Sequence, residues 1–133
     1  MIVVDTSAII AALAGSPAVP RLGARLASAG ELHSPHLLDV EFLHALRRLV
    51  GAGVLSADRA TDARDDLADL AIIRYPHVAL SDRMWELRHT VTPYDAAFLA
   101  LAEALDVPLV TCDGRLARAS GHRARVEIFA PGS

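Results

Sequence analysis

Residues 1–10 read MIVVDTSAII, and the rest of the chain can be interpreted around this stretch. Residues 2–4 are β-branched and contain no polar side chain, which is typical of a strand covered on both faces within a parallel sheet. Asp5 follows directly, and parallel α/β sheets bind their ligands outside the carboxyl ends of their strands. The stretch predicts an α/β fold with chemistry at Asp5. Taken alone, however, it favours the plainer interpretation of Asp5 as a turn residue and Ser7 as a helix cap.

The composition indicates one domain over residues 1–133, long enough to bury a core. Hydrophobic residues make up 53% of the chain, so we expect a partner to cover part of the apolar surface. Residues 6–20 form the longest stretch without charge, which is too short to cross a bilayer. No basic segment precedes the first apolar run, which argues against a secretory signal. The lone Cys112 cannot form an internal disulfide, and we expect a cytoplasmic protein.

The formal net charge is −3, which argues against a protein that coats nucleic acid by bulk electrostatics. A local basic rim remains open, since the chain has 13 basic residues, all of them Arg. The six His residues show no i, i+4 zinc pair. We expect His33 and His36 to lie at the surface.

Helices and strands are expected to alternate along the chain. Helices are predicted at residues 7–14, 21–29, 35–49, 57–70, 81–90, 93–105 and 116–119. Strands are predicted at residues 2–4, 31–34, 108–111 and 125–129, the last at the sheet edge, while residues 71–75 fit a strand or a helix end. Ser34 and Pro35 have the form of a cap and first helical residue, and Thr92 and Pro93 have the same form.

The lengths of these elements predict that distant acids meet. A helix over residues 94–105 spans about 18 Å, and the strand over residues 108–111 is of similar length. Only two residues separate them, so they must pack antiparallel, and Asp113 returns close to Asp95. Helix 35–49 likewise begins at the carboxyl edge of the sheet, which places Glu41 level with Asp5.

Glu41 interrupts an apolar helical stripe. Positions 38, 41, 42, 45, 46 and 49 read Leu, Glu, Phe, Ala, Leu and Leu. A carboxylate there must reach solvent or find a partner, because burying it unpaired is costly. The alternative is that Glu41 pairs with Arg48 or lies at the margin of the stripe. Asp95 and Asp113 can both act as ordinary caps, which does not exclude a second role.

Together, these four acids would place about four negative charges in one cleft, where like charges raise one another's pKa. Oxygen ligands without a His or Cys pair favour a hard cation such as Mg²⁺ or Mn²⁺. Carboxylate-held Mg²⁺ commonly serves phosphodiester hydrolysis, because it activates a water and stabilises the leaving oxygen.

Four segments, in this order, resemble a PIN domain: VVDTSAII, DVEFLHALRR, TPYDAAFLALAEAL and VPLVTCDGRLARA. The chain length is similar to that of a VapC-type toxin of a toxin–antitoxin (VapBC) pair. The resemblance implies a three-layer sandwich with a short, mainly parallel central sheet flanked by helices. It also implies that Asp5, Glu41, Asp95 and Asp113 are the catalytic acids that bind Mg²⁺ or Mn²⁺.

The resemblance assigns further roles. Thr6 or Ser7, and Thr111, would occupy hydroxyl positions that hold the carboxylates or water, although each also fits as a cap or strand residue. The family implies a metal-dependent endoribonuclease, usually a homodimer, silenced by a small VapB-type antitoxin that wraps the toxin and covers its active site.

Four functions compete at this point. In an endoribonuclease, metal-activated water attacks phosphorus, and Arg47, Arg48, Arg115 and Arg118 are candidates to hold the RNA backbone. The alternative is a catalytically weak PIN-like protein-binding module, for which a lost acid would be the expected sign, and none is lost. A receiver-like phosphotransfer domain would need a Lys, which this chain lacks, and a haloacid-dehalogenase-type phosphatase would need Asp rather than Ser at position 7.

Overall fold

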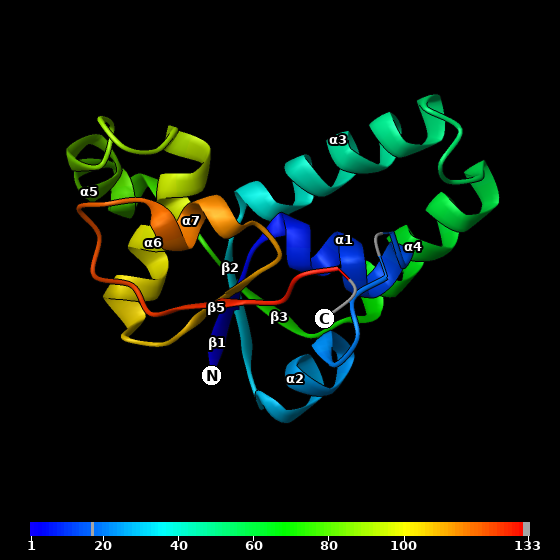
Figure 1. Cartoon of the computed structure of the whole chain (residues 1–133), viewed down its shortest axis with the longest axis horizontal. Coiled ribbons are helices and arrows are strands. Elements are labelled where there is room, and N and C mark those ends of the chain that lie inside the picture. The colour runs from blue at the N-terminus through cyan, green and yellow to red at the C-terminus, as the bar shows by residue number, and fades with distance from the viewer. Residues whose placement is uncertain (17, 132–133) are drawn as a thin grey trace.

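A parallel sheet of five strands lies at the centre of the computed structural model, which describes residues 1–16 and 18–131 (Figure 1). The strands are β1 (Ile2–Val4), β2 (Leu32–Pro35), β3 (Ile72–Tyr75), β4 (Leu109–Thr111) and β5 (Val126–Ile128). Their order across the sheet is β3-β2-β1-β4-β5, and every neighbouring pair is parallel. β1 is therefore central, and β5 forms an edge as the sequence predicts.

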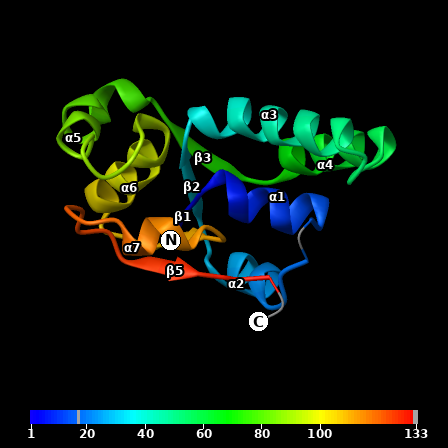
Figure 2. The same cartoon turned by 45° about the horizontal axis from the view of Figure 1, so that its top comes forward.

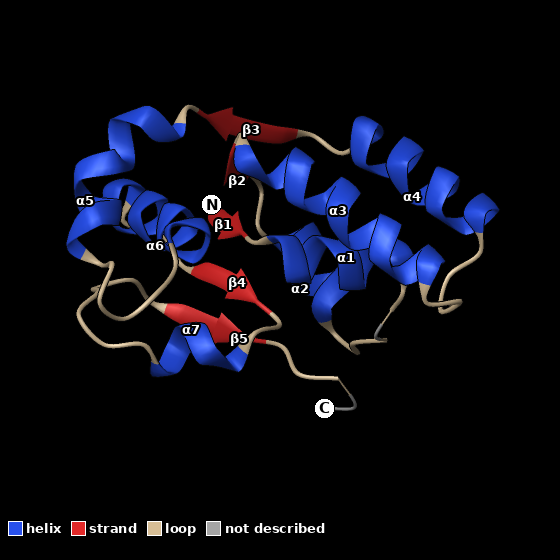
Figure 3. Cartoon of the chain, turned by 90° about the horizontal axis from the view of Figure 1, so that it is seen from above, coloured by secondary structure: helices blue, strands red, loops and turns tan. Residues whose placement is uncertain are grey.

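Helices flank this sheet on two sides (Figure 3). The helices are α1 (Thr6–Ala14), α2 (Leu22–Ser28), α3 (Leu37–Gly51), α4 (Ala57–Asp69), the 3₁₀ helix η1 (His77–Leu80), α5 (Ser81–Glu86), α6 (Pro93–Leu105) and α7 (Gly114–Arg118). α5 and α6 lie together on one side, and α1, α3 and α4 group on the other (Figures 2 and 3). The predicted α/β fold with a parallel central sheet is confirmed.

The core forms where β1 meets α6. All three residues of β1 are fully buried. α6 is buried over seven consecutive residues, 96–102, because it packs against the sheet as well as against α5 and η1. A helix that is apolar all round is expected in such an enclosed position. Within the described residues no helix is long and apolar enough to span a membrane.

The predicted helix start at Ser34 and Pro35 is wrong. Both residues are buried in β2, which pairs with β1 and β3, and α3 begins only at Leu37. The Ser34 hydroxyl donates to the Val4 carbonyl (3.3 Å) instead of capping a helix. Pairing with two neighbouring strands outweighs the local capping preference here.

Other boundaries differ by a few residues or resolve an ambiguity. Within residues 71–75, which the sequence left open, Ile72–Tyr75 form the edge strand β3. The helix predicted at 81–90 ends at Glu86, and the one predicted at 116–119 begins at Gly114. Helix boundaries are the least certain part of any assignment from sequence, because the ends fray and are fixed by tertiary contacts.

The expected surface position of His33 is also wrong. Its side chain is 2% exposed, because it points into the core from β2, an internal strand. Its Nδ1 lies 2.7 Å from the Tyr75 hydroxyl in a hydrogen bond, and its Nε2 lies 3.3 Å from Glu31 Oε1. His36, by contrast, is exposed as expected.

Candidate active site

The four carboxylates singled out above line one cavity of about 230 Å³. They are Asp5 directly after β1, Glu41 in the second turn of α3, Asp95 in the first turn of α6, and Asp113 just after β4. β1 and β4 are parallel neighbours, so their carboxyl ends deliver Asp5 and Asp113 to the same edge of the sheet. The structure thus brings together four acids that are widely separated in sequence.

Asp5 is the most deeply buried of these acids, at 6% exposure. It is the N-cap of α1, a role the sequence offered to Ser7, and its Oδ1 accepts from the Ala8 N–H (3.0 Å). The Ser7 hydroxyl donates to the same oxygen (2.7 Å), and the Thr111 hydroxyl donates to Oδ2. Both carboxylate oxygens are therefore held in one orientation.

The same two hydroxyls also position the segment that carries Asp113. The Cys112 N–H donates to Ser7 Oγ (2.9 Å), and the Asp113 N–H donates to Thr111 Oγ1 (2.9 Å). Ser7 and Thr111 thereby connect the ends of β1 and β4. The supporting role at a catalytic site that the resemblance implies for them stays a prediction.

Thr6 provides the partner that Glu41 requires. Its hydroxyl donates to Glu41 Oε1 at 2.6 Å, so this carboxylate is not paired with Arg48. The contact joins the first residue of α1 to the apolar stripe of α3. The interruption of that stripe is thus explained by a neighbour that lines the same cavity.

Thr92 is the N-cap of α6, as the sequence predicts, and Pro93 begins the helix. The Thr92 hydroxyl accepts a hydrogen bond from the Asp95 backbone N–H (3.3 Å), so the cap is Thr92 and not Asp95. The carboxylate of Asp95 lines the acidic cavity. The capped start of α6 therefore also places a carboxylate at the site.

Asp113 has a cationic partner. The Arg115 guanidinium donates from Nε (3.0 Å to Oδ1) and from Nη2 (2.6 Å to Oδ2), and the Arg115 backbone N–H also donates to Oδ1 (3.0 Å). This bonding lowers the pKa of Asp113. Asp113 is thus the acid of the cavity that is ionised most easily.

The other three acids experience the opposite effect. Burial raises the pKa of Asp5 to about 6, although the hydrogen bonds from Thr111 and Ser7 act to lower it. Burial also raises the pKa of Glu41 and that of Asp95, and each of these shifts is increased by a neighbouring acid of the cavity. The cavity is a crowded anionic site in which added positive charge would be favourable.

The donor set fits a hard cation in its chemistry. Four acidic residues line the cavity together with Thr6 and Ser7, and its volume accommodates an ion with several waters. Over residues 1–16 and 18–131, however, no three His, Cys, Asp or Glu side chains already stand close enough to hold a metal ion. Glu41 and Asp113 are bonded to Thr6 and Arg115 instead.

Two cavity residues were missed in the sequence. His44 follows Glu41 by three positions on α3, and Phe98 follows Asp95 by three positions on α6. A spacing of three places each pair on one helix face, so the signal was present once the acids had been assigned.

The Arg candidates fall into two groups. Arg115 pairs with Asp113, which lines the cavity, and the charge of Arg118 also lowers the pKa of Asp113. Arg47 and Arg48 instead line two other pockets along α3. Cys112 is half-buried, and burial raises the pKa of its thiol to about 11, so it stays protonated at neutral pH.

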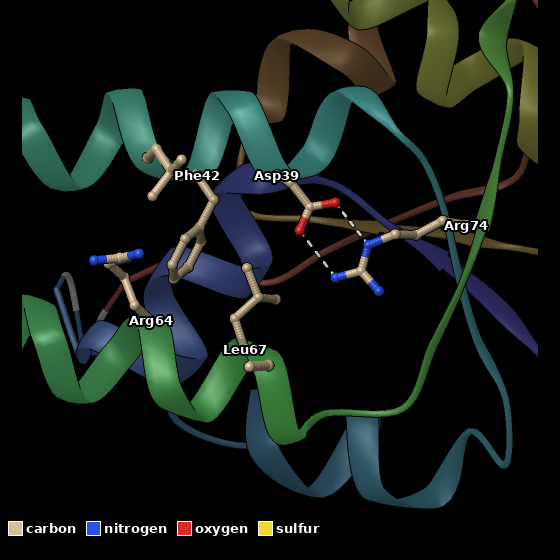
Figure 4. A pocket seen from close by; sticks show the side chains of 7 residues that line it. Asp39, Phe42, Arg64, Leu67 and Arg74 are labelled. Atoms are coloured by element: carbon tan, nitrogen blue, oxygen red, sulfur yellow. Dashed lines mark hydrogen bonds and ion pairs between the residues drawn. The ribbon is translucent and has the colours of Figure 1, made fainter.

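A second pocket, of about 210 Å³, lies between α3 and α4 but has a different character (Figure 4). Its Arg74 guanidinium pairs with both carboxylate oxygens of Asp39, at 2.6 and 2.9 Å. Phe42 and Leu67 supply apolar walls. The charged groups Arg74 and Asp39 satisfy each other, so the acidic cavity is the better candidate for chemistry.

The fold and the cavity define a parallel α/β protein with an acid-lined site at the carboxyl edge of its sheet. The PIN domain profile matches residues 2–121, and the chain belongs to the PIN-domain family, among the VapC ribonucleases. Ribonuclease VapC1 of Mycobacterium tuberculosis is 46% identical over 127 residues, which cover 95% of this chain and 96% of the relative. The resemblance noted in the sequence is confirmed.

Solved structures share the fold. PAE2754 from Pyrobaculum aerophilum superimposes with a TM-score of 0.67 at 25% identity, over 94% of this chain and 82% of that chain. VapBC2 from Rickettsia felis was solved bound to a DNA fragment from its own promoter. It superimposes with a TM-score of 0.70 at 14% identity, over 97% of this chain and 99% of that chain. The second likeness supports the fold alone.

Proposed function

We propose that this protein is a metal-dependent endoribonuclease that acts as the toxin of a toxin–antitoxin pair. The observation that carries the proposal is the convergence of four acids, from four separate elements, on one cavity at the carboxyl edge of the sheet. The names of its relatives support the reaction class, since VapC1 is called a ribonuclease. Mg²⁺ or Mn²⁺ would be the cofactor, held by Asp5, Glu41, Asp95 and Asp113.

The chain's own residues would prepare this site before any substrate arrives. A bound Mg²⁺ or Mn²⁺ would supply positive charge for water activation and for the leaving oxygen. Ser7 and Thr111 fix the direction of the Asp5 carboxylate, and Thr6 does the same for Glu41. Such fixed orientation reduces the reorganisation needed during the reaction.

Arg side chains would bind the RNA backbone. Arg115 and Arg118 are favoured over Arg47 and Arg48, because the former two act electrostatically on Asp113 at the cavity. Contacts of this kind are lost as salt concentration rises. RNA binding should therefore weaken with ionic strength.

The partner of the toxin would be a small VapB-type antitoxin, and the toxin itself would form a homodimer in the cytoplasm. Several large apolar side chains are exposed and could be covered in such assemblies. They include Val40, Leu43, Val54, Val78, Trp85 and Tyr94.

Chelation tests the metal requirement. Purified protein treated with EDTA should lose RNA cleavage but keep its melting temperature within a few degrees, because the cavity lies at the edge of the sheet and the apolar core does not depend on an ion. Added Mn²⁺ should restore cleavage. Cleavage at the full rate in EDTA would contradict the metal mechanism, and no cleavage under any metal condition would favour the catalytically weak binding module.

A further inference from the structure

Arg115 is bonded to the Asp113 carboxylate, which is one of the four proposed to bind the cation. Its Nε lies 3.0 and 3.1 Å from the two oxygens of Asp113, and its Nη2 lies 2.6 Å from Oδ2. Both carboxylate oxygens are therefore engaged by one guanidinium, in the fork geometry that suits arginine. A divalent cation that used these oxygens would meet a positive group already bound to them.

The charge of Arg115 reaches beyond Asp113. It opposes the rise in the pKa of Asp95 that burial produces, so the guanidinium acts on two of the four cavity acids. Asp113 in turn raises the pKa of Asp5 and that of Asp95. Arg115 thus provides compensating charge where the carboxylates repel one another.

The ion pair between Arg115 and Asp113 is exposed enough to be broken when another cation binds Asp113. The Arg115 side chain is 74% exposed, while that of Asp113 is 24% exposed. Exposed ion pairs are weak and are screened by salt, and a long arginine side chain can turn into solvent without moving the backbone. The Asp113 backbone, in contrast, is anchored, because its N–H donates to Thr111 Oγ1 and the residue lies two positions after the end of β4.

We propose that Arg115 is an internal counter-ion that competes with the divalent cation for Asp113, and that cation binding releases its guanidinium to contact a phosphate of RNA bound beside Asp113. The inference rests on the proposed function. In this scheme Arg115 pairs with Asp113 while no cation is bound, and it binds RNA once it is released.

Mn²⁺ titration calorimetry at pH 7.5 tests the competition on the full chain. Arg115→Gln should bind Mn²⁺ about tenfold more tightly than wild type, the size expected for removing a unit positive charge from within about 5 Å of the ion in a solvent-screened site. The matched control is Arg125→Gln. Arg125 also forms an exposed ion pair with an aspartate, Asp106 (2.9 Å), but at the other end of α6. The control should bind Mn²⁺ as wild type does.

RNA binding tests the release. With Mn²⁺ present and an uncleavable 2′-O-methyl RNA, Arg115→Gln should bind several-fold more weakly than wild type, while Arg125→Gln should be unchanged. If Arg115 were merely structural, its replacement would weaken the affinities for both Mn²⁺ and RNA. The proposed competition instead predicts tighter Mn²⁺ binding and weaker RNA binding. Melting temperatures in EDTA check that both variants are folded.

The outcomes separate the inference from the proposed function. Equal Mn²⁺ affinity in all three proteins, or weaker affinity in Arg115→Gln, overturns the competition while the endoribonuclease proposal stands. Unchanged RNA affinity in Arg115→Gln overturns the release. Failure of every variant to bind Mn²⁺, combined with cleavage in EDTA, overturns the inference and the metal mechanism together.

Discussion

Asp5 carries the highest electrostatic cost among the cavity acids. It is almost fully buried, and burial raises its pKa from 3.8 to about 6. Between about pH 4 and pH 6 the folded state therefore binds a proton that the unfolded state has already lost. The contribution of Asp5 to the free energy of unfolding therefore falls as pH rises through this window, by roughly 3 kcal/mol, and this cost is fully present above pH 6.

Asp5→Asn removes this cost. Without cation at pH 7.5 the variant should be as stable as wild type or more stable, because the lost ionisation penalty outweighs the loss of one hydrogen-bond acceptor. Near pH 4 the advantage should disappear, since wild-type Asp5 is then protonated. Urea unfolding in EDTA at the two pH values measures the difference, and a variant that is less stable at pH 7.5 would contradict the argument. RNA cleavage with Mg²⁺ should be lost at both.

Asp95→Asn distinguishes a cap from a site residue. Asp95 is the third residue of α6, and a merely structural role there predicts a loss of a few tenths to about 1 kcal/mol with activity intact. A site role predicts the reverse: stability in EDTA at least equal to wild type, because burial and Asp113 both raise the pKa of Asp95, and cleavage abolished. Melting temperature in EDTA and RNA cleavage in Mg²⁺ decide between them. An active variant would remove Asp95 from the site.

At the scale of single elements, the start of α6 connects stability to the site. The Thr92 hydroxyl accepts a hydrogen bond from the Asp95 N–H. This one bond caps α6 and holds the backbone of Asp95, which lines the cavity. Thr92→Ala should cost about 1 kcal/mol, which lowers the melting temperature by about 3 °C in a chain of this size. Thr92→Ser keeps the hydroxyl and should restore most of the loss. Equal melting temperatures for the Ala and Ser variants would mean that the cap contributes nothing.

The elements also show what the sequence could predict. The start of α6 was predictable because Thr92, Pro93 and Asp95 give one local signal that the fold does not oppose. Ser34 and Pro35 give a similar signal, yet β2 runs through them, since two neighbouring strands pair with it. Local preference succeeds where the surroundings agree with it and fails inside the sheet.

The site was predictable for a related reason. Strand ends and short connections fix the positions of Asp5, Asp95 and Asp113, and these features can be derived from spacing alone. The contact between Arg115 and Asp113, by contrast, depends on a side-chain conformation that no spacing specifies. The burial of His33 was missed because it depends on β3, which the sequence left ambiguous.

At the scale of the whole molecule, exposed apolar side chains gather in two places. Val40, Leu43 and Val54 lie on α3 and in the turn that follows it, whereas Val78 and Trp85 lie on η1 and α5. α3 and α5 are on opposite sides of the sheet (Figure 2). Two separate apolar surfaces are consistent with two partners, a second copy of the chain and an antitoxin.

The chain expressed alone should therefore form a dimer or aggregate, and coexpression with the product of a neighbouring antitoxin gene should give a more soluble complex. Light scattering after size exclusion measures both states. Leu43→Ser and Trp85→Ser each remove one exposed apolar side chain, 50% and 67% exposed, from one of the two surfaces. Because neither side chain belongs to the core, each variant should keep its melting temperature, and at least one should shift the protein towards monomer. A wild-type chain that stays a dilute, monodisperse monomer and binds no neighbouring gene product would show that these surfaces need no partner.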